Sequence, residues 1–181
     1  MTQKLAFRKL DGTAIGNVSQ YVKNWITEYP YGEIIIGCDS QEHSRYVKYA
    51  IVIVMHVFFE SKYDNPNRIG NGAHVIKSII FDKKHKTPKG VMRIKDGRRE
   101  FDTSTIQGRL WKEVELTIEA AQMLEGCQKK IMIHVDYNSD KSAASHTLYA
   151  SGIGYANGMG YEAKGKPFSY VATHTADRLC R

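Results

Sequence analysis

The stretch EIIIGCD, residues 33–39, is an almost wholly apolar run that ends in an aspartate. The stretch IMIHVD, residues 131–136, has the same build and also ends in an aspartate. Short apolar runs of this kind are typical of strands that are buried on both faces of a sheet. In open α/β sheets, functional sites form beyond the carboxyl ends of the strands. If the two strands are parallel neighbours, Asp39 and Asp136 stand side by side at one such edge.

The rest of the chain alternates between strand and helix patterns. β-branched and aromatic runs predict strands over residues 46–59, 73–81 and 161–164. Apolar residues at helical spacing predict helices over residues 17–28, 107–124, 142–159 and 171–179. After the first helix the order is β-β-β-α-β-α-β-α, and the helix before the strand 131–136 allows that strand to pair in parallel with the first. No linker or repeat divides the chain, so we expect residues 1–181 to form a single domain.

Length and composition exclude several classes of protein. The chain has 181 residues, of which 42% are hydrophobic and 25% charged, as in ordinary globular proteins. The longest apolar run, residues 50–55, is far short of the roughly 18 residues that a membrane span needs, and no signal-peptide core follows the N-terminus. Three cysteines are an odd number without paired spacing, which indicates reduced thiols. We therefore expect a cytoplasmic protein without a membrane partner.

The charge favours a polyanionic partner. Lys and Arg number 26 against 19 Asp and Glu, a net charge of +7, and such a balance favours nucleic acid. Residues 83–99 hold eight basic residues and a single acid, Asp96, beside a glycine that favours a tight hairpin. This stretch is either a phosphate-binding surface or a solvated hairpin whose lysines protect a sheet edge. The residues expected to contact nucleic acid are Ser40 and Gln41, directly after Asp39, and Lys86, Lys89, Arg93, Lys95, Arg98 and Arg99.

Further acids are spaced to join the two aspartates. On the helix 107–124, Glu113 and Glu115 flank the inward-facing Val114, and either can reach the sheet edge. On the last helix His174 and Asp177 are three residues apart, which places them on one face. Clustered carboxylates need a neutralising cation, and their hard oxygen atoms suit magnesium or manganese. The alternative is that the aspartates cap turns and the glutamates face solvent.

Four motifs together resemble a known family. GCDSQ at 37–41, RLWKE at 109–113, IHVD at 133–136 and ADR at 176–178 resemble the ribonuclease H-like YkuK family, a bacterial and phage group within the RNase H-like (retroviral integrase) superfamily. The resemblance covers about residues 10–181, with residues 83–104 as a basic insertion. It implies an α/β fold with a mixed five-stranded RNase H-like sheet flanked by helices, here with an extra N-terminal helix.

The resemblance also implies a chemistry. Asp39 is similar to the aspartate that bridges two metal ions in this superfamily, and the other positions of the set are Glu113, Asp136 and Asp177. With two Mg²⁺ or Mn²⁺ ions, the set implies a nuclease that hydrolyses RNA:DNA hybrids or branched DNA, with His174 assisting proton transfer. The alternative is a non-catalytic nucleic-acid-binding module with the same fold. A resolvase-type reaction requires a dimer, and the sequence leaves the oligomeric state open.

Overall fold

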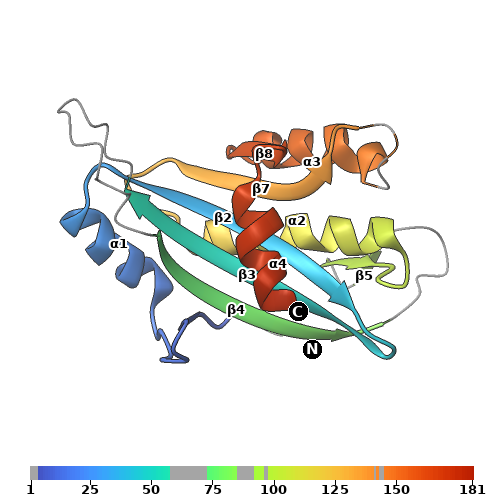
Figure 1. Cartoon of the computed structure of the whole chain (residues 1–181), viewed down its shortest axis with the longest axis horizontal. Helices are drawn as coiled ribbons and strands as arrows, with labels where there is room; N and C mark the ends of the chain where they lie inside the picture. The colour runs from blue at the N-terminus through green and yellow to red at the C-terminus, as the bar shows by residue number, and fades with distance from the viewer. Residues whose placement is uncertain (1–3, 58–72, 85–91, 96–97, 141, 143–144) are drawn as a thin grey trace.

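The computed structural model describes residues 4–57, 73–84, 92–95, 98–140, 142 and 145–181. Its main sheet has six strands in the order β1-β4-β3-β2-β7-β8, with helices on both faces (Figure 1). These strands are β1 (Arg8–Lys9), β2 (Gly32–Glu42), β3 (Tyr46–Val57), β4 (Ala73–Lys83), β7 (Ile131–Asn138) and β8 (Glu162–Lys166). The helices are α1 (Val18–Glu28), α2 (Ile106–Gln122), α3 (His146–Gly158), the π-helix η1 (Val171–Ala176) and α4 (Asp177–Cys180).

The strand pairing confirms the mixed α/β sheet expected of an RNase H-like fold. β2, β3 and β4 pair antiparallel in succession, whereas β7 lies parallel to β2 and to β8. The predicted strands and helices all occur, with ends that differ by a few residues, and residues 58–59 of the strand expected over 46–59 lie outside the described residues. The strand that sequence reasoning missed is β1, a sixth strand that pairs with β4. Its two residues are too few to show a strand alternation.

Alternate residues of β2 pack into two separate hydrophobic cores, one on each face of the sheet. Ile34, Ile36 and Cys38 belong to the larger core, which α1, α2 and α3 cover. Ile35 lies in a smaller core on the opposite face, together with residues of β3 and η1. Figure 1 shows η1 and α4 crossing β2 and β3 on this second face. The end of β2 is therefore approached by helices from both sides of the sheet.

The last helix begins with a wider turn than predicted. The expected α-helix over 171–179 is a π-helix, η1, that continues into the short α4. Gly37 allows η1 to lie against β2, because a Cβ atom at this position would be 2.8 Å from the backbone nitrogen of Ala172. The backbone N–H of Val171 also donates to Nδ1 of His134, at 3.3 Å. Burial lowers the pKa of His134 to about 4, so the ring accepts this bond as a neutral imidazole.

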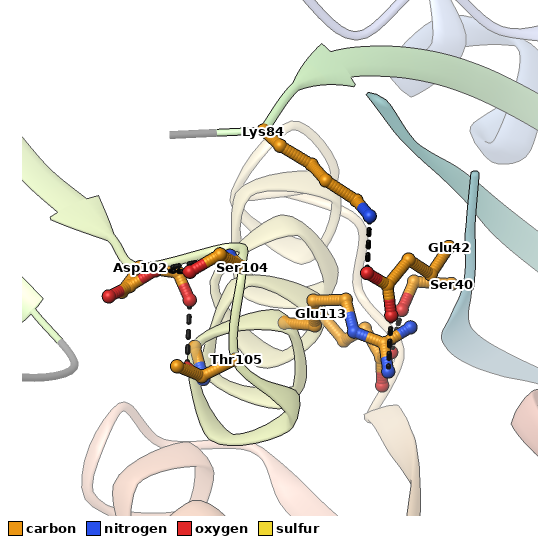
Figure 2. Close-up of polar contacts among 9 residues, drawn as sticks. Ser40, Glu42, Lys84, Asp102, Ser104, Thr105 and Glu113 are labelled. Carbon is orange, nitrogen blue, oxygen red and sulfur yellow. Dashed lines mark hydrogen bonds and ion pairs between the residues drawn. The ribbon is translucent and has the colours of Figure 1, made fainter. Parts of the chain in front are cut away.

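The start of α2 is fixed by a local hydrogen-bond network (Figure 2). The Thr105 hydroxyl accepts from the backbone N–H of Gly108 at 3.1 Å, as an N-cap does. The same hydroxyl donates to the carbonyl of Asp102 at 2.9 Å. Gly108 is required here, because a Cβ atom would lie 2.0 Å from that carbonyl oxygen. The network sets where α2 begins and hence where Glu113, two turns further on, meets the sheet.

The predicted hairpin in the basic stretch is present as β5 (Met92–Lys95) and β6 (Arg98–Phe101). The Asp96–Gly97 dipeptide between the two strands lies outside the described residues. Arg99 of β6 pairs with Glu115 of α2 and donates to the Tyr155 hydroxyl of α3. Its guanidinium also lies over the Tyr155 ring, 5.0 Å from the centroid. Arg99 thus anchors the hairpin to the two helices.

Cys38, Cys127 and Cys180 carry free thiols, and the first and last of these are buried. In the part of the chain that the structure describes, no helix combines the length and apolarity needed to cross a membrane.

Candidate active site

Asp39 and Asp136 end adjacent parallel strands at the same edge of the sheet. The register pairs Gly37 with His134, and each aspartate follows two residues later on its own strand. Both are partly buried. Burial and the charge of Asp136 raise the pKa of Asp39 to about 6, and Asp177 adds to the rise. The negative charges at this edge therefore act on one another.

Glu113 reaches the same edge from α2. Its side chain is only 4% exposed, and Oε1 accepts a 2.6 Å hydrogen bond from the Ser40 hydroxyl on β2 (Figure 2). The second oxygen, Oε2, is buried and has no hydrogen-bond partner among the described residues. Burial, followed by the charge of Asp39, raises the pKa of Glu113 well above its usual range. Glu115 points instead to Arg99 of the hairpin, so the geometry favours Glu113 as the helix acid at this edge.

Asp177, the first residue of α4, approaches from the other face. The Arg181 guanidinium binds it through two contacts, Nη2 to Oδ2 at 2.7 Å and Nε to Oδ1 at 3.2 Å. His174 precedes it in η1 and is exposed. The predicted shared face of these two residues assumed α-helical winding. The wider winding of a π-helix changes the angle between residues three apart, so the spacing alone no longer aligns them.

Besides Arg181, three polar neighbours of the acids in the described part of the chain escaped sequence reasoning. Lys166 of β8 pairs with Asp136 at 2.9 Å between Nζ and Oδ1, and the Thr173 hydroxyl donates to the same oxygen at 2.7 Å. The Cys180 thiol donates to the backbone carbonyl of Asp39 at 3.0 Å. Lys166 lies two residues beyond the predicted end of its strand. No periodic signal marks Thr173 or Cys180, because only the tertiary fold brings them to this edge.

A comparison with protein families gives a match. The model of a family described as "Ribonuclease H-like" matches residues 66–181, which is more than half of the chain. The chain belongs to the ribonuclease H-like family. The match includes Glu113, Asp136 and Asp177, whereas Asp39 lies before its first residue. No curated protein and no solved structure matches the chain.

The donor chemistry of this ribonuclease H-like site fits a hard divalent cation. Its acids offer carboxylate oxygens, and the buried Oε2 of Glu113 lacks a partner in the described structure. The side chains do not yet converge on one point, since no group of three or more His, Cys, Asp or Glu within the described ranges is placed to hold one ion. Asp136 and Asp177 face Lys166 and Arg181 instead. Side-chain cations thus partly neutralise the acids in this arrangement.

Of the residues predicted to contact nucleic acid, some are exposed, some are bonded within the protein, and some lie outside the described part of the structure. Gln41 is exposed at the end of β2, and the Ser40 hydroxyl is engaged with Glu113. Arg99 is held by Glu115, so the structure assigns it an anchoring role within the protein. Lys86 and Lys89 lie outside the described residues, as do the side chains of Arg93, Lys95 and Arg98.

Proposed function

We propose that the chain is a divalent-metal-dependent nuclease that hydrolyses phosphodiester bonds in RNA:DNA hybrids or branched DNA. The observation that supports this most strongly is the position of Asp39 and Asp136 at the ends of adjacent parallel strands. Burial, together with the charges of Asp136 and Asp177, raises the pKa of Asp39 there. Bound cations would offset the repulsion between the carboxylates of such a cluster. Within the ribonuclease H-like family, we further propose membership of the YkuK group on the four motifs quoted above.

Each acid has a role in this proposal. Two Mg²⁺ or Mn²⁺ ions would supply an activated water and charge stabilisation of the leaving 3′ oxygen. Asp39 would bridge them, Glu113 and Asp136 would hold one, and Asp177 the other. Ser40 orients Glu113 through their hydrogen bond. The exposed His174 would take up or release a proton near the product.

The positions of the side-chain cations favour a second candidate function. Lys166 and Arg181 already pair with two of the acids, and such pairing suits a domain that binds nucleic acid without cutting it. In the nuclease, these acids would exchange Lys166 and Arg181 for metal ions. In the binding module, both ion pairs would persist in Mg²⁺.

Cleavage assays separate the two functions. Labelled hybrid, duplex, single-stranded and four-way-junction substrates are incubated with Mg²⁺ or Mn²⁺, and with EDTA. The nuclease predicts cutting that needs metal and is lost in Asp39→Asn and in Asp136→Asn, while the matched control Asp140→Asn, on an exposed turn, cuts normally. Salt-sensitive binding without cutting in any metal would leave the binding module standing.

A further inference from the structure

Lys166 stands among the acids because of an irregular pairing between two strands. It is the last residue of β8, the strand that lies parallel to β7 at the end of the sheet. Between His134 and Asn138, β7 advances four residues while β8 advances only two, to Lys166. Irregularities of this kind redirect side chains. Asp136 falls within it, and its Oδ1 lies 2.9 Å from the Lys166 Nζ.

The Lys166 ammonium acts on both strand-end aspartates. The lysine side chain is 34% exposed and that of Asp136 is 24% exposed, so their contact is partly shielded from solvent. Burial raises the pKa of Asp39, and the charge of Lys166 acts against that rise. Arg181 differs, because its side chain is 74% exposed and its partner Asp177 is one helical turn away. Of these two cations, Lys166 is the one placed within the acid edge.

Asp136 does not depend on Lys166 alone for its position. The Thr173 hydroxyl donates to the same Oδ1 at 2.7 Å, and the Ser169 hydroxyl lies 3.3 Å from the Thr173 hydroxyl. Partly exposed ion pairs contribute little to stability. The ammonium can therefore leave Asp136 at small cost, while the Thr173 hydroxyl keeps the carboxylate in place.

We propose that Lys166 is a phosphate-binding residue, which contacts the phosphodiester to be cut when Asp136 holds a divalent cation. Without that cation the ammonium pairs with the nearest carboxylate, as the structure shows. Once Asp136 is neutralised, a phosphate oxygen is the stronger partner for the ammonium. Lysine has a long, flexible side chain. Because Nζ already lies 2.9 Å from a carboxylate oxygen of Asp136, a phosphate bound beside that residue is within its reach.

This inference rests on the proposed function, since it adds a substrate-binding residue to the same acids. The two claims can fail separately. Metal-dependent cutting by the wild type tests the nuclease, whereas the effect of Mn²⁺ on nucleic-acid binding tests Lys166. A wild type that cuts, together with a Lys166 variant that binds normally in Mn²⁺, would remove this inference and leave the nuclease standing.

The test is fluorescence anisotropy of the full chain with a labelled RNA:DNA hybrid and a labelled four-way junction, in EDTA and in Mn²⁺. Readings are taken directly after mixing, and a denaturing gel confirms that the strands are intact. In Mn²⁺, Lys166→Gln is expected to bind about 10- to 150-fold more weakly than the wild type, the loss of one charge-assisted hydrogen bond. In EDTA the loss should be much smaller, because the ammonium then pairs with Asp136. Lys166→Arg keeps the charge and should retain binding, and the control Lys130→Gln, at the opposite end of β7, should bind like the wild type.

Metal binding without nucleic acid gives a second measurement. Lys166→Gln is expected to bind Mn²⁺ up to about 5-fold more tightly than the wild type, because the ammonium no longer competes for Asp136. Tighter metal binding and weaker nucleic-acid binding in Mn²⁺ are therefore expected together in one variant. The proposal is overturned if the loss of nucleic-acid binding in Mn²⁺ is no larger than the loss in EDTA. It is also overturned if Lys166→Gln binds Mn²⁺ no more tightly than the wild type.

Discussion

Replacing Asp39 by asparagine is expected to stabilise the metal-free protein at neutral pH. The Asp39 carboxylate is partly buried beside Asp136 and Asp177, and its pKa rises from 3.8 to about 6. A carboxyl group whose pKa is raised by folding binds more protons in the folded state than in the unfolded state. Its contribution to stability is therefore full below about pH 4 and is lost as the pH rises through about 6.

The size of the effect follows from that rise. At about 1.4 kcal/mol per pKa unit, the ionised Asp39 costs the folded state about 3 kcal/mol at pH 7. An asparagine has the same shape and no charge, so it removes this cost. For a chain of this length, 3 kcal/mol corresponds to a rise of about 6–12 °C in melting temperature.

Thermal unfolding in EDTA at pH 4 and pH 7 measures this directly. The free energy of unfolding of the wild type should fall between the two pH values more steeply than that of Asp39→Asn. Asp140→Asn is the control, because Asp140 is exposed and its hydrogen bonds to Ser142 lower its pKa, so it cannot give the same gain. An Asp39→Asn variant that melts at or below the wild-type temperature at pH 7, with the same pH slope, would refute the reasoning.

Two further substitutions test how the site is assembled. Gly37→Ala should lower the free energy of unfolding by about 1–3 kcal/mol, because the new methyl group would press on the backbone of Ala172. Urea unfolding measures this change. In the control Gly158→Ala the new methyl group meets no atom within 4 Å, so that variant should be as stable as the wild type or more stable. Arg99→Ala should cost at most about 1 kcal/mol, since its pair with Glu115 is partly exposed. Arg99→Ala should also leave unchanged the slope of log Kd for nucleic acid against log salt concentration. A slope that falls by about 0.7 would instead show that Arg99 contacts a phosphate.

Most of the sheet could be predicted because its strands carry strong local signals. The two apolar runs that end in Asp39 and Asp136 predict two buried strands, and the structure pairs these strands in parallel, with Gly37 opposite His134. The π-helical turn of η1 could not be predicted in this way. Its winding depends on close packing against Gly37, which is a tertiary contact between distant parts of the chain.

The candidate site was predictable in its acids more than in their partners. The strand ends point to Asp39 and Asp136, because the chemistry and the local pattern coincide there. The helix stripe left Glu113 and Glu115 as alternatives, and only their tertiary contacts with Ser40 and Arg99 separate them. Arg181, four residues after Asp177, could have been found from helical spacing. Lys166 could not be found so directly, because its contact with Asp136 depends on where β8 ends.

The most direct test of the central claim counts metal ions at the sheet edge. Mn²⁺ is titrated into the full chain, and the free ion is followed by its electron paramagnetic resonance signal. Two bound Mn²⁺ per chain are expected for the wild type and for Asp140→Asn, with weakened or lost binding in Asp39→Asn and Glu113→Gln. Wild-type protein that binds no Mn²⁺, or an Asp39→Asn variant that binds two ions as tightly as the wild type, would contradict a metal site built on these carboxylates.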